Sequence, residues 1–132
     1  MILRELVLSY RPARDAQDHP IPCPSVPIRD PATAVPLLMQ LLASEPHEVI
    51  GALYVNTRYQ VLGWRVLARG SLDAVVVTPR EILQAGLLLN AKGLLLAHFV
   101  PWNKMRLLCH GPLRGRSKDI PLSTVEQTAL RT

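Results

Sequence analysis

The sequence of 132 residues predicts one α/β domain, a mixed sheet flanked by helices. Two apolar runs, residues 48–55 and 93–98, have the length and composition of buried strands. Two helix starts, at Asp30 and Thr78, each combine a capping residue with a following proline. The resulting order, strand–helix–hairpin–strand–helix–strand, favours an α/β domain over an all-α or all-β one.

The first third of the chain begins β-leaning and then becomes proline-rich. Residues 2–9, ILRELVLS, are expected to form an edge strand. Residues 11–31 hold six of the twelve prolines, which cannot donate ladder hydrogen bonds, so they predict an extended loop. Asp30 is then expected to cap a helix whose first residue is Pro31. The apolar face of this helix consists of Val35, Leu38, Leu41 and Leu42.

The middle of the chain predicts a hairpin. Residues 48–55, EVIGALYV, are apolar almost throughout, as expected of a central strand buried on both faces. Residues 56–59, NTRY, predict a turn, and residues 60–68 are expected to return antiparallel. After the break at Gly70, residues 74–77 predict a third short strand.

The strongest local signal is the start of the second helix. Thr78 is a capping threonine, Pro79 occupies the first helical position, and Glu81 stands third, which together predict a capping box. The helix is expected to run to about Asn90. The residues that it is expected to bury are Ile82, Leu83, Gly86, Leu87 and Leu89.

After Pro101 the periodicity weakens and the composition changes. Residues 105–109 predict a short strand, and Ser123 with Glu126 predicts a short terminal helix. Residues 102–132 carry a net charge of +4, whereas residues 1–101 carry +1. The sequence therefore predicts two parts, a domain core over 1–101 and a divergent basic tail over 102–132.

The basic tail is the one feature that points to nucleic acid. Arg114, Arg116 and Lys118 lie close together and predict a weak contact with phosphates, without sequence selectivity. Three phosphate contacts limit the log–log salt slope to about −3. No aromatic residues are interleaved with the basic ones, which argues against a stacking surface for single strands.

Membrane and secretory signals are not apparent in the sequence. No apolar run approaches the roughly 18 residues of a membrane span, and the N-terminus lacks the apolar core of a signal peptide. Two cysteines, Cys23 and Cys109, provide no disulfide framework. We therefore expect a cytoplasmic protein.

Several blocks in order resemble the central part of RadC-like proteins, which carry a JAB/MPN (JAMM-type) metalloprotease domain. They are the acidic residue before the first central strand, the turn N-T-R, R-G-S-L, the helix start T-P-R-E and the strand N-A-x-x-L-L-L-A-H. The similarity runs from about residue 2 to 98. It implies a cytidine-deaminase-like JAB/MPN fold, a mixed sheet flanked by helices. Because the similarity stops there, the domain is expected to be truncated at its C-terminus.

The resemblance also implies a site. The family motif is a glutamate, then H-x-H-P-S-G, then S-x-x-D, in which two histidines and the aspartate bind zinc and the glutamate is the general base. Such a site needs three protein ligands and one open position for water. Its relatives with known activity cleave amide or isopeptide bonds, and the family name is tied to DNA repair.

Carried over residue by residue, the motif is only partly present. Glu48 stands at the general base, His98 at the first histidine ligand and Pro101 at the motif proline. The other motif positions are occupied by Val100, Trp102, Asn103, Leu108 and Gly111. Valine and glycine side chains offer no lone pair to a metal, so the zinc site is expected to be weak or absent and hydrolysis lost.

A second ligand set involves the tail. His110 and Asp119 are ligand types, and they would join His98 if the chain folded back, although adjacent strand residues such as Cys109 and His110 face opposite ways. Two explanations of the tail stay open. It is a natural variant that lost catalysis and kept a scaffold, or the product of a truncated or frame-shifted gene.

Two functions follow as expectations. The first is a RadC-like domain from a zinc-dependent hydrolase family, with an incomplete, inactive site and a protein or peptide as its substrate class. The second is a non-enzymatic scaffold on the same fold, with the basic tail touching nucleic acid. Metal content separates them, because a working hydrolase of this type needs about one zinc per chain.

Overall fold

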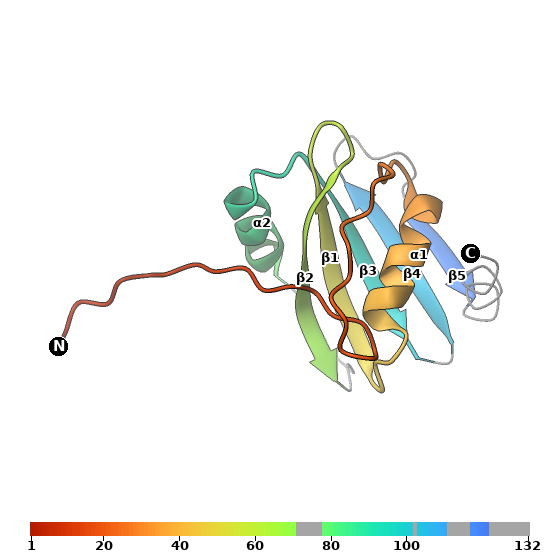
Figure 1. The fold of residues 1–132 in the computed structure, drawn as a ribbon, viewed down its shortest axis with the longest axis horizontal. Coiled ribbons are helices and arrows are strands. Elements are labelled where there is room, and N and C mark those ends of the chain that lie inside the picture. The colour runs from red at the N-terminus through yellow and green to blue at the C-terminus, as the bar shows by residue number, and fades with distance from the viewer. Residues whose placement is uncertain (71–77, 102, 111–116, 122–132) are drawn as a thin grey trace.

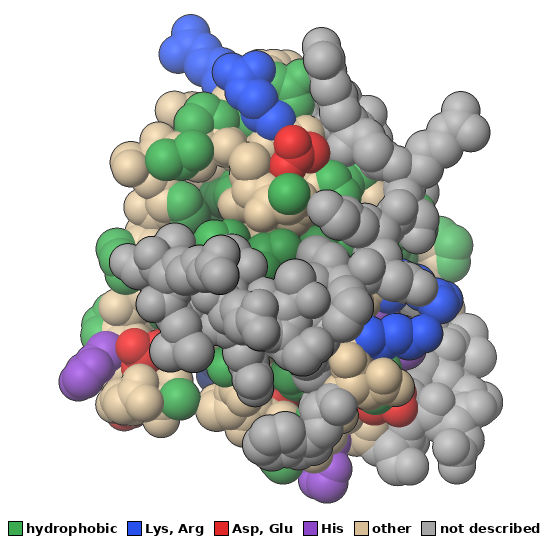
Figure 2. Space-filling view, turned by 90° about the vertical axis from the view of Figure 1, so that its right-hand side faces the viewer, with side chains coloured by type: hydrophobic (Ala, Val, Ile, Leu, Met, Phe, Trp, Pro, Cys, Tyr) green, Lys and Arg blue, Asp and Glu red, His purple; other side chains and the backbone are tan. Residues whose placement is uncertain are grey.

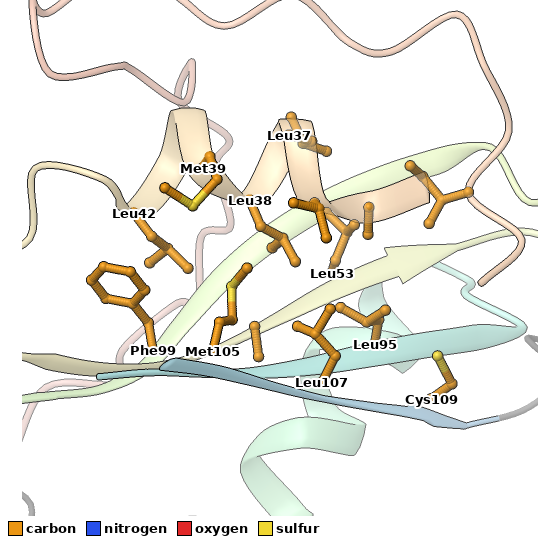
Figure 3. Close-up of a cluster of buried hydrophobic side chains, with 14 of the residues drawn as sticks. Leu37, Leu38, Met39, Leu42, Leu53, Leu95, Phe99, Met105, Leu107 and Cys109 are labelled. Atoms are coloured by element: carbon orange, nitrogen blue, oxygen red, sulfur yellow. The ribbon is translucent and has the colours of Figure 1, made fainter. Parts of the chain in front are cut away.

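The computed structural model describes residues 1–70, 78–101, 103–110 and 117–121, and for His110 and residues 117–121 it describes the backbone. Its elements are α1 (Pro31–Leu42), β1 (Glu48–Val55), β2 (Val61–Gly70), α2 (Pro79–Leu88), β3 (Gly93–Val100), β4 (Lys104–His110) and β5 (Ser117–Pro121). The strands form one sheet in the order β2-β1-β3-β4-β5. Helices α1 and α2 lie on opposite faces of this sheet (Figure 1; Figure 3). The predicted α/β class, with helices flanking a sheet, is confirmed.

All four neighbouring strand pairs among the described residues are antiparallel, so the sheet is not mixed as predicted. The reason lies in the connection through α2. Strands β2 and β3 run in the same direction, but the chain between them crosses β1, which separates them in the sheet. Two parallel strands that are not neighbours leave no parallel pair.

Helix α1 begins where the sequence predicts. The Asp30 carboxylate accepts a hydrogen bond from the backbone N–H of Thr33 at 2.9 Å, and the Thr33 hydroxyl lies 3.4 Å from the backbone nitrogen of Asp30. Pro31 occupies the first turn, where its missing N–H costs nothing. The helix continues through Pro36 to Leu42.

Helix α2 has the predicted cap but a different buried side. The Thr78 hydroxyl accepts from the Glu81 backbone N–H at 3.4 Å, and the helix ends at Leu88. Its one fully buried residue is Ala85, whereas Leu83 and Leu87 are 57% and 82% exposed, so their predicted burial was wrong. Ile82, Gly86 and Leu89 are partly buried.

Leu83 and Leu87 are exposed because of the side on which α2 approaches the sheet. A Cβ added at Gly86 would lie 3.3 Å from the ring of Tyr54, so small residues bring the helix close at this point. The Tyr54 hydroxyl donates to the Ile82 carbonyl at 2.7 Å, and the Arg65 guanidinium donates to the Glu81 carbonyl at 3.1 Å. These bonds fix the side of α2 that meets the sheet.

The main core lies between α1 and the sheet (Figure 3). Alternate residues of the central strands point toward α1, as the strict alternation of buried and half-buried residues along β3 shows. This core contains Leu38, Leu42, Leu53, Leu95, Phe99, Met105 and Leu107, all at most 3% exposed. On the opposite face, the fully buried cluster among the described residues is Ala52, Tyr54 and Ala85.

The N-terminal strand predicted for residues 2–9 does not form. This stretch is extended but pairs with no strand of the described chain, and Figure 1 shows it running away from the folded body. A strand needs a partner for its backbone groups, and none of the described strands runs alongside this stretch. The short strand predicted at residues 74–77 and the helix predicted after Ser123 lie outside the described residues.

The strand predicted at residues 105–109 is confirmed as part of β4, which pairs with β3 along its whole length. A tight turn connects them, closed by a hydrogen bond from the Asn103 N–H to the Val100 carbonyl at 3.1 Å. Met105 and Leu107 are 0% exposed and Cys109 is 8% exposed. The predicted tail therefore packs into the core as far as Cys109. Neither described helix has the length and apolar character needed to cross a membrane.

Candidate functional site

Glu48 and His98, the two residues matched to the predicted site, lie next to each other in space. Glu48 opens β1, and His98 in β3 is paired with Ile50 of β1. The His98 Nε2 lies 3.4 Å from the Glu48 Oε2, and the two side chains are 39% and 34% exposed. The sheet thus brings together a carboxylate and an imidazole separated by 50 residues in the sequence. Both remain open to solvent.

Val100 stands where a second histidine would complete the pair of ligands. In a strand, residues two apart share a face, so Val100 lies on the same side of the sheet as His98. The backbone therefore has the geometry that an H-x-H pair requires. The side chain does not, because an isopropyl group has no atom to donate to a metal.

The second predicted ligand set is spread over the sheet. Asp119 is paired with Arg106, and Arg106 with His98, so all three occupy one row across β5, β4 and β3. Two strand spacings separate Asp119 from His98 at the backbone, roughly 10 Å. His110 is paired with Leu94, four residues from His98 along β3, or roughly 13 Å. The register brings Asp119 into the row of His98 and leaves His110 outside it.

Other motif positions add no ligand. Leu108 is paired with Leu96, and Gly111 and Trp102 lie outside the described residues. Cys109 faces α1 in the buried core, where burial, followed by the charge of Asp30, raises the pKa of its thiol. It lies on the opposite face from His98, so it acts as a small hydrophobic residue of the core.

A three-ligand zinc centre does not fit the side chains that the structure describes. Across the described ranges, no three His, Cys, Asp or Glu side chains come close enough together to hold one ion. The structure brings together Glu48 and His98, the residues matched to the base and the first ligand of the motif, and Val100 stands at the position matched to the second histidine. No catalytic step through a bound zinc follows from this set of donors.

Arg106 is the residue of this site that the sequence did not indicate. It stands directly across from His98 in β4 and is exposed. The signal was present in the alternation of residues 105–109, in which Met105, Leu107 and Cys109 face the core. Reading that alternation as a core strand would have placed Arg106 on the site face. The His98 imidazole and the Arg106 residue are thus neighbours across the strands, with the Glu48 carboxylate beside the imidazole.

An apolar groove of about 720 Å³ lies elsewhere, between the N-terminal residues, β2 and α2. It contains neither Glu48 nor His98, so it is separate from the site. Its lining includes Leu6, Leu8, Tyr10, Trp64, Leu88 and Leu89. Trp64 also packs against the α1 core.

The basic tail lies partly outside the described residues. Arg114 and Arg116 lie outside the described residues, and Lys118 is paired with Leu107. Figure 2 views the right-hand side of Figure 1, toward β5. On that face, the Lys and Arg side chains of the described residues form separate groups among hydrophobic and neutral atoms. A nucleic-acid contact stays a prediction.

Comparison with known proteins identifies the same family that the sequence motifs resemble. The family model described as RadC-like JAB domain matches residues 28–107. A UPF0758 protein of Pseudomonas fluorescens strain SBW25 is 33% identical over 103 residues, which cover 78% of this chain and 42% of that protein. A UPF0758 protein of Marinobacter nauticus is 36% identical over 89 residues, 67% of this chain and 39% of that protein.

A UPF0758 protein of Methylibium petroleiphilum is 42% identical over 76 residues, 57% of this chain and 34% of that protein. The chain thus spans between a third and somewhat over two fifths of the length of these relatives. No solved structure gives a significant match. The match to the family model continues past Pro101, into the part of β4 that packs in the core.

Proposed function

We propose a binding function for this chain, which belongs to the RadC-like JAB domain family. It is a non-hydrolytic member of the family, and it binds a protein or peptide without cleaving it. The observation that carries this proposal is the Glu48–His98 contact beside Val100. The frame of a hydrolase site is retained, with its base position and first ligand 3.4 Å apart. The second ligand on the same face is replaced by a side chain with no donor atom.

The pair retains a binding chemistry of its own. With about a third of each side chain exposed, the Glu48 carboxylate can accept a hydrogen bond and the His98 imidazole can donate or accept one. Arg106, opposite His98, adds a guanidinium with several donors. Such a row suits polar groups of a peptide backbone or terminus, which need both donors and acceptors.

Metal content tests the proposal directly. Protein purified without chelators is expected to contain well under one zinc per chain by elemental analysis, because one imidazole does not hold a catalytic zinc. The matched variant is His98→Ala, which should leave the zinc content unchanged. Stoichiometric zinc that His98→Ala removes would contradict the proposal and favour a ligand set that includes Asp119.

A histidine placed at position 100 tests whether the backbone at His98 still has the geometry of a metal site. Val100→His places a second imidazole two residues from His98 on the same face, and zinc affinity by titration calorimetry should rise several-fold over the natural chain. Thr57→His, in the exposed β1–β2 turn, is the control for an added surface histidine. Equal zinc binding by Val100→His and Thr57→His would show that the site frame is not retained.

A further inference from the structure

Strand β2 forms an open edge of the sheet (Figure 1). It pairs with β1 on one side, and no strand of the described residues pairs with its other side. Nine of its ten residues are half-buried, whereas residues 51–55 of β1 are fully buried. An edge strand presents backbone N–H and C=O groups outward, so β2 can accept a further strand.

The apolar groove of about 720 Å³ follows this edge. Its lining includes five consecutive residues of β2, residues 61–65, and successive strand residues point to opposite faces. The lining also includes Leu37 and Leu53 from the α1 core and Ala85 and Leu89 from the α2 side. A groove that reaches residues of both faces lies around the edge of the sheet rather than on one face.

Several apolar side chains of the groove are open to solvent. Leu6 and Tyr10 of the N-terminal segment are 83% and 80% exposed, and Leu88 of α2 is 55% exposed. A contiguous exposed apolar surface of this kind marks an interaction site. The groove therefore offers apolar contacts beside the free backbone groups of β2.

The charged side chains of the groove have one sign. Arg11 and Arg65 line it, and the described lining residues include neither Asp nor Glu. Arg11 is exposed. Arg65 donates one hydrogen bond to the Glu81 carbonyl at 3.1 Å, and a guanidinium has five donors in all. A carboxylate on the occupant is therefore complementary to the groove.

The regular part of the edge is short. The register of β2 with β1 shifts between Ile50 and Gly51 and again between Tyr54 and Val55, which leaves residues 63–66 in unbroken pairing. Only alternate residues of an edge direct both backbone groups outward, so this stretch provides roughly two such residues. An added strand is thus about four to six residues long, and it binds weakly.

We propose that this groove binds an extended peptide segment that pairs with β2 as an added strand and carries apolar side chains and an acidic residue. Backbone hydrogen bonds to β2 supply affinity, and the side chains of the groove select the apolar residues of the peptide. Arg11 and Arg65 select its carboxylate. The inference goes beyond the proposed function, because the groove contains neither Glu48 nor His98.

A synthetic hexapeptide tests the backbone pairing. It alternates valine and threonine around one glutamate and carries a neutral dye, so that fluorescence anisotropy with the full chain gives its Kd. Two methylated forms carry N-methyl groups on the odd or on the even amides. Because one set of amides faces β2 and the other faces solvent, one form should bind on the order of tenfold more weakly and the other within about twofold of the parent.

Two leucines of α2 test the location. Leu88 and Leu83 are 55% and 57% exposed on the same helix, and of the two Leu88 lines the groove. Leu88→Ser should weaken binding roughly fivefold, whereas Leu83→Ser should change it less than about twofold. Circular dichroism checks that both variants fold.

Charge exchange tests the choice of an acidic peptide. Arg11→Glu should weaken binding of the glutamate peptide roughly two- to fivefold, as expected of an exposed ion pair, and should strengthen binding of the same peptide with lysine in place of glutamate. Arg58→Glu is the control, since Arg58 is exposed in the β1–β2 turn and does not line the groove.

Four results would overturn the proposal. They are no binding of the hexapeptide to the full chain, equal binding of both methylated forms and the parent, equal losses in Leu88→Ser and Leu83→Ser, and equal effects of Arg11→Glu and Arg58→Glu. Loss of binding in His98→Ala with full binding by Leu88→Ser would place the peptide at the candidate site. That result would overturn the inference and leave the proposed function standing.

Discussion

The two faces of the sheet are built from the same strands but differ in how completely they are covered. Toward α1, side chains from α1, β1, β3 and β4 form one closed cluster (Figure 3). Toward α2, the buried cluster is small, and Glu48 and His98 stay partly exposed beside it. Within β3, Leu95, Ala97 and Phe99 face the first side, and His98 faces the second.

Because the two faces differ in this way, the residues that stabilise the fold are not the residues that form the candidate site. Because strand side chains alternate between faces, each strand contributes to the α1 core with one set of residues and to the site with the other. A residue on the α2 face such as Val100 can therefore differ without opening the core, and β4 can follow a tight turn and still pack Met105 and Leu107. In such a domain, residues of the partly exposed face can change while the α1 core stays closed.

The largest expected difference between the two faces of the sheet concerns one leucine on each helix. Leu38 of α1 is 0% exposed in the core, so Leu38→Ala should lower the free energy of unfolding by about 2–5 kcal/mol. Leu87 of α2 is 82% exposed, so Leu87→Ala should change it within about ±0.5 kcal/mol. Urea denaturation measures both. Equal losses would mean that α2 carries a core as important as that of α1.

Gly51 tests how tightly the α1 face of β1 is filled. A Cβ added there would lie 2.1 Å from the Trp64 ring, so Gly51→Ala should cost about 1–3 kcal/mol by forcing the ring to shift. In a Trp64→Ala background the same change should cost much less. Thermal and urea unfolding of the four chains complete this cycle. Additive costs would show that the two residues do not contact each other.

Tyr54 tests the link between α2 and the sheet. Its hydroxyl donates to the Ile82 carbonyl, so Tyr54→Phe should cost about 1 kcal/mol. Burial raises the pKa of Tyr54, and Arg65 lowers it by a smaller amount. A raised pKa in the folded state means that its contribution is complete below the unfolded pKa of about 10 and is lost as pH rises further.

The natural chain should therefore lose stability above about pH 10 more steeply than Tyr54→Phe, as urea midpoints at several alkaline pH values would show. Parallel curves for the two chains would indicate that Tyr54 ionises as freely in the folded state as in the unfolded one. The bond to Ile82 would then contribute little to the docking of α2.

The smallest effect is expected in the site itself. Glu48→Gln should change the free energy of unfolding within about ±0.5 kcal/mol, because Glu48 is partly exposed and its contact with the His98 ring is open to solvent. The control is Glu45→Gln, since Glu45 is 17% exposed and lies 2.7 Å from Arg69. A larger loss at Glu48 than at Glu45 would mean that the site face also supports the fold.

Much of the local structure could be predicted from the sequence alone. The caps at Asp30 and Thr78 act within three residues along the chain, and the bounds of β1 follow from its continuous apolar run. The positions of Glu48 and His98 in the site followed from the family resemblance. Each of these features depends on residues close together in the sequence or on a motif spacing.

Only the tertiary structure decided which surfaces meet. The crossing of β1 by the α2 connection, the rotation of α2 onto Tyr54 and the placement of Arg106 beside His98 all depend on contacts between distant segments. The strand-like residues 2–9 show the same limit, since their composition favours a strand but no strand of the described residues pairs with them. Local propensity sets what a segment can become, and the backbone hydrogen bonds of a strand require a partner whose position the local sequence does not encode.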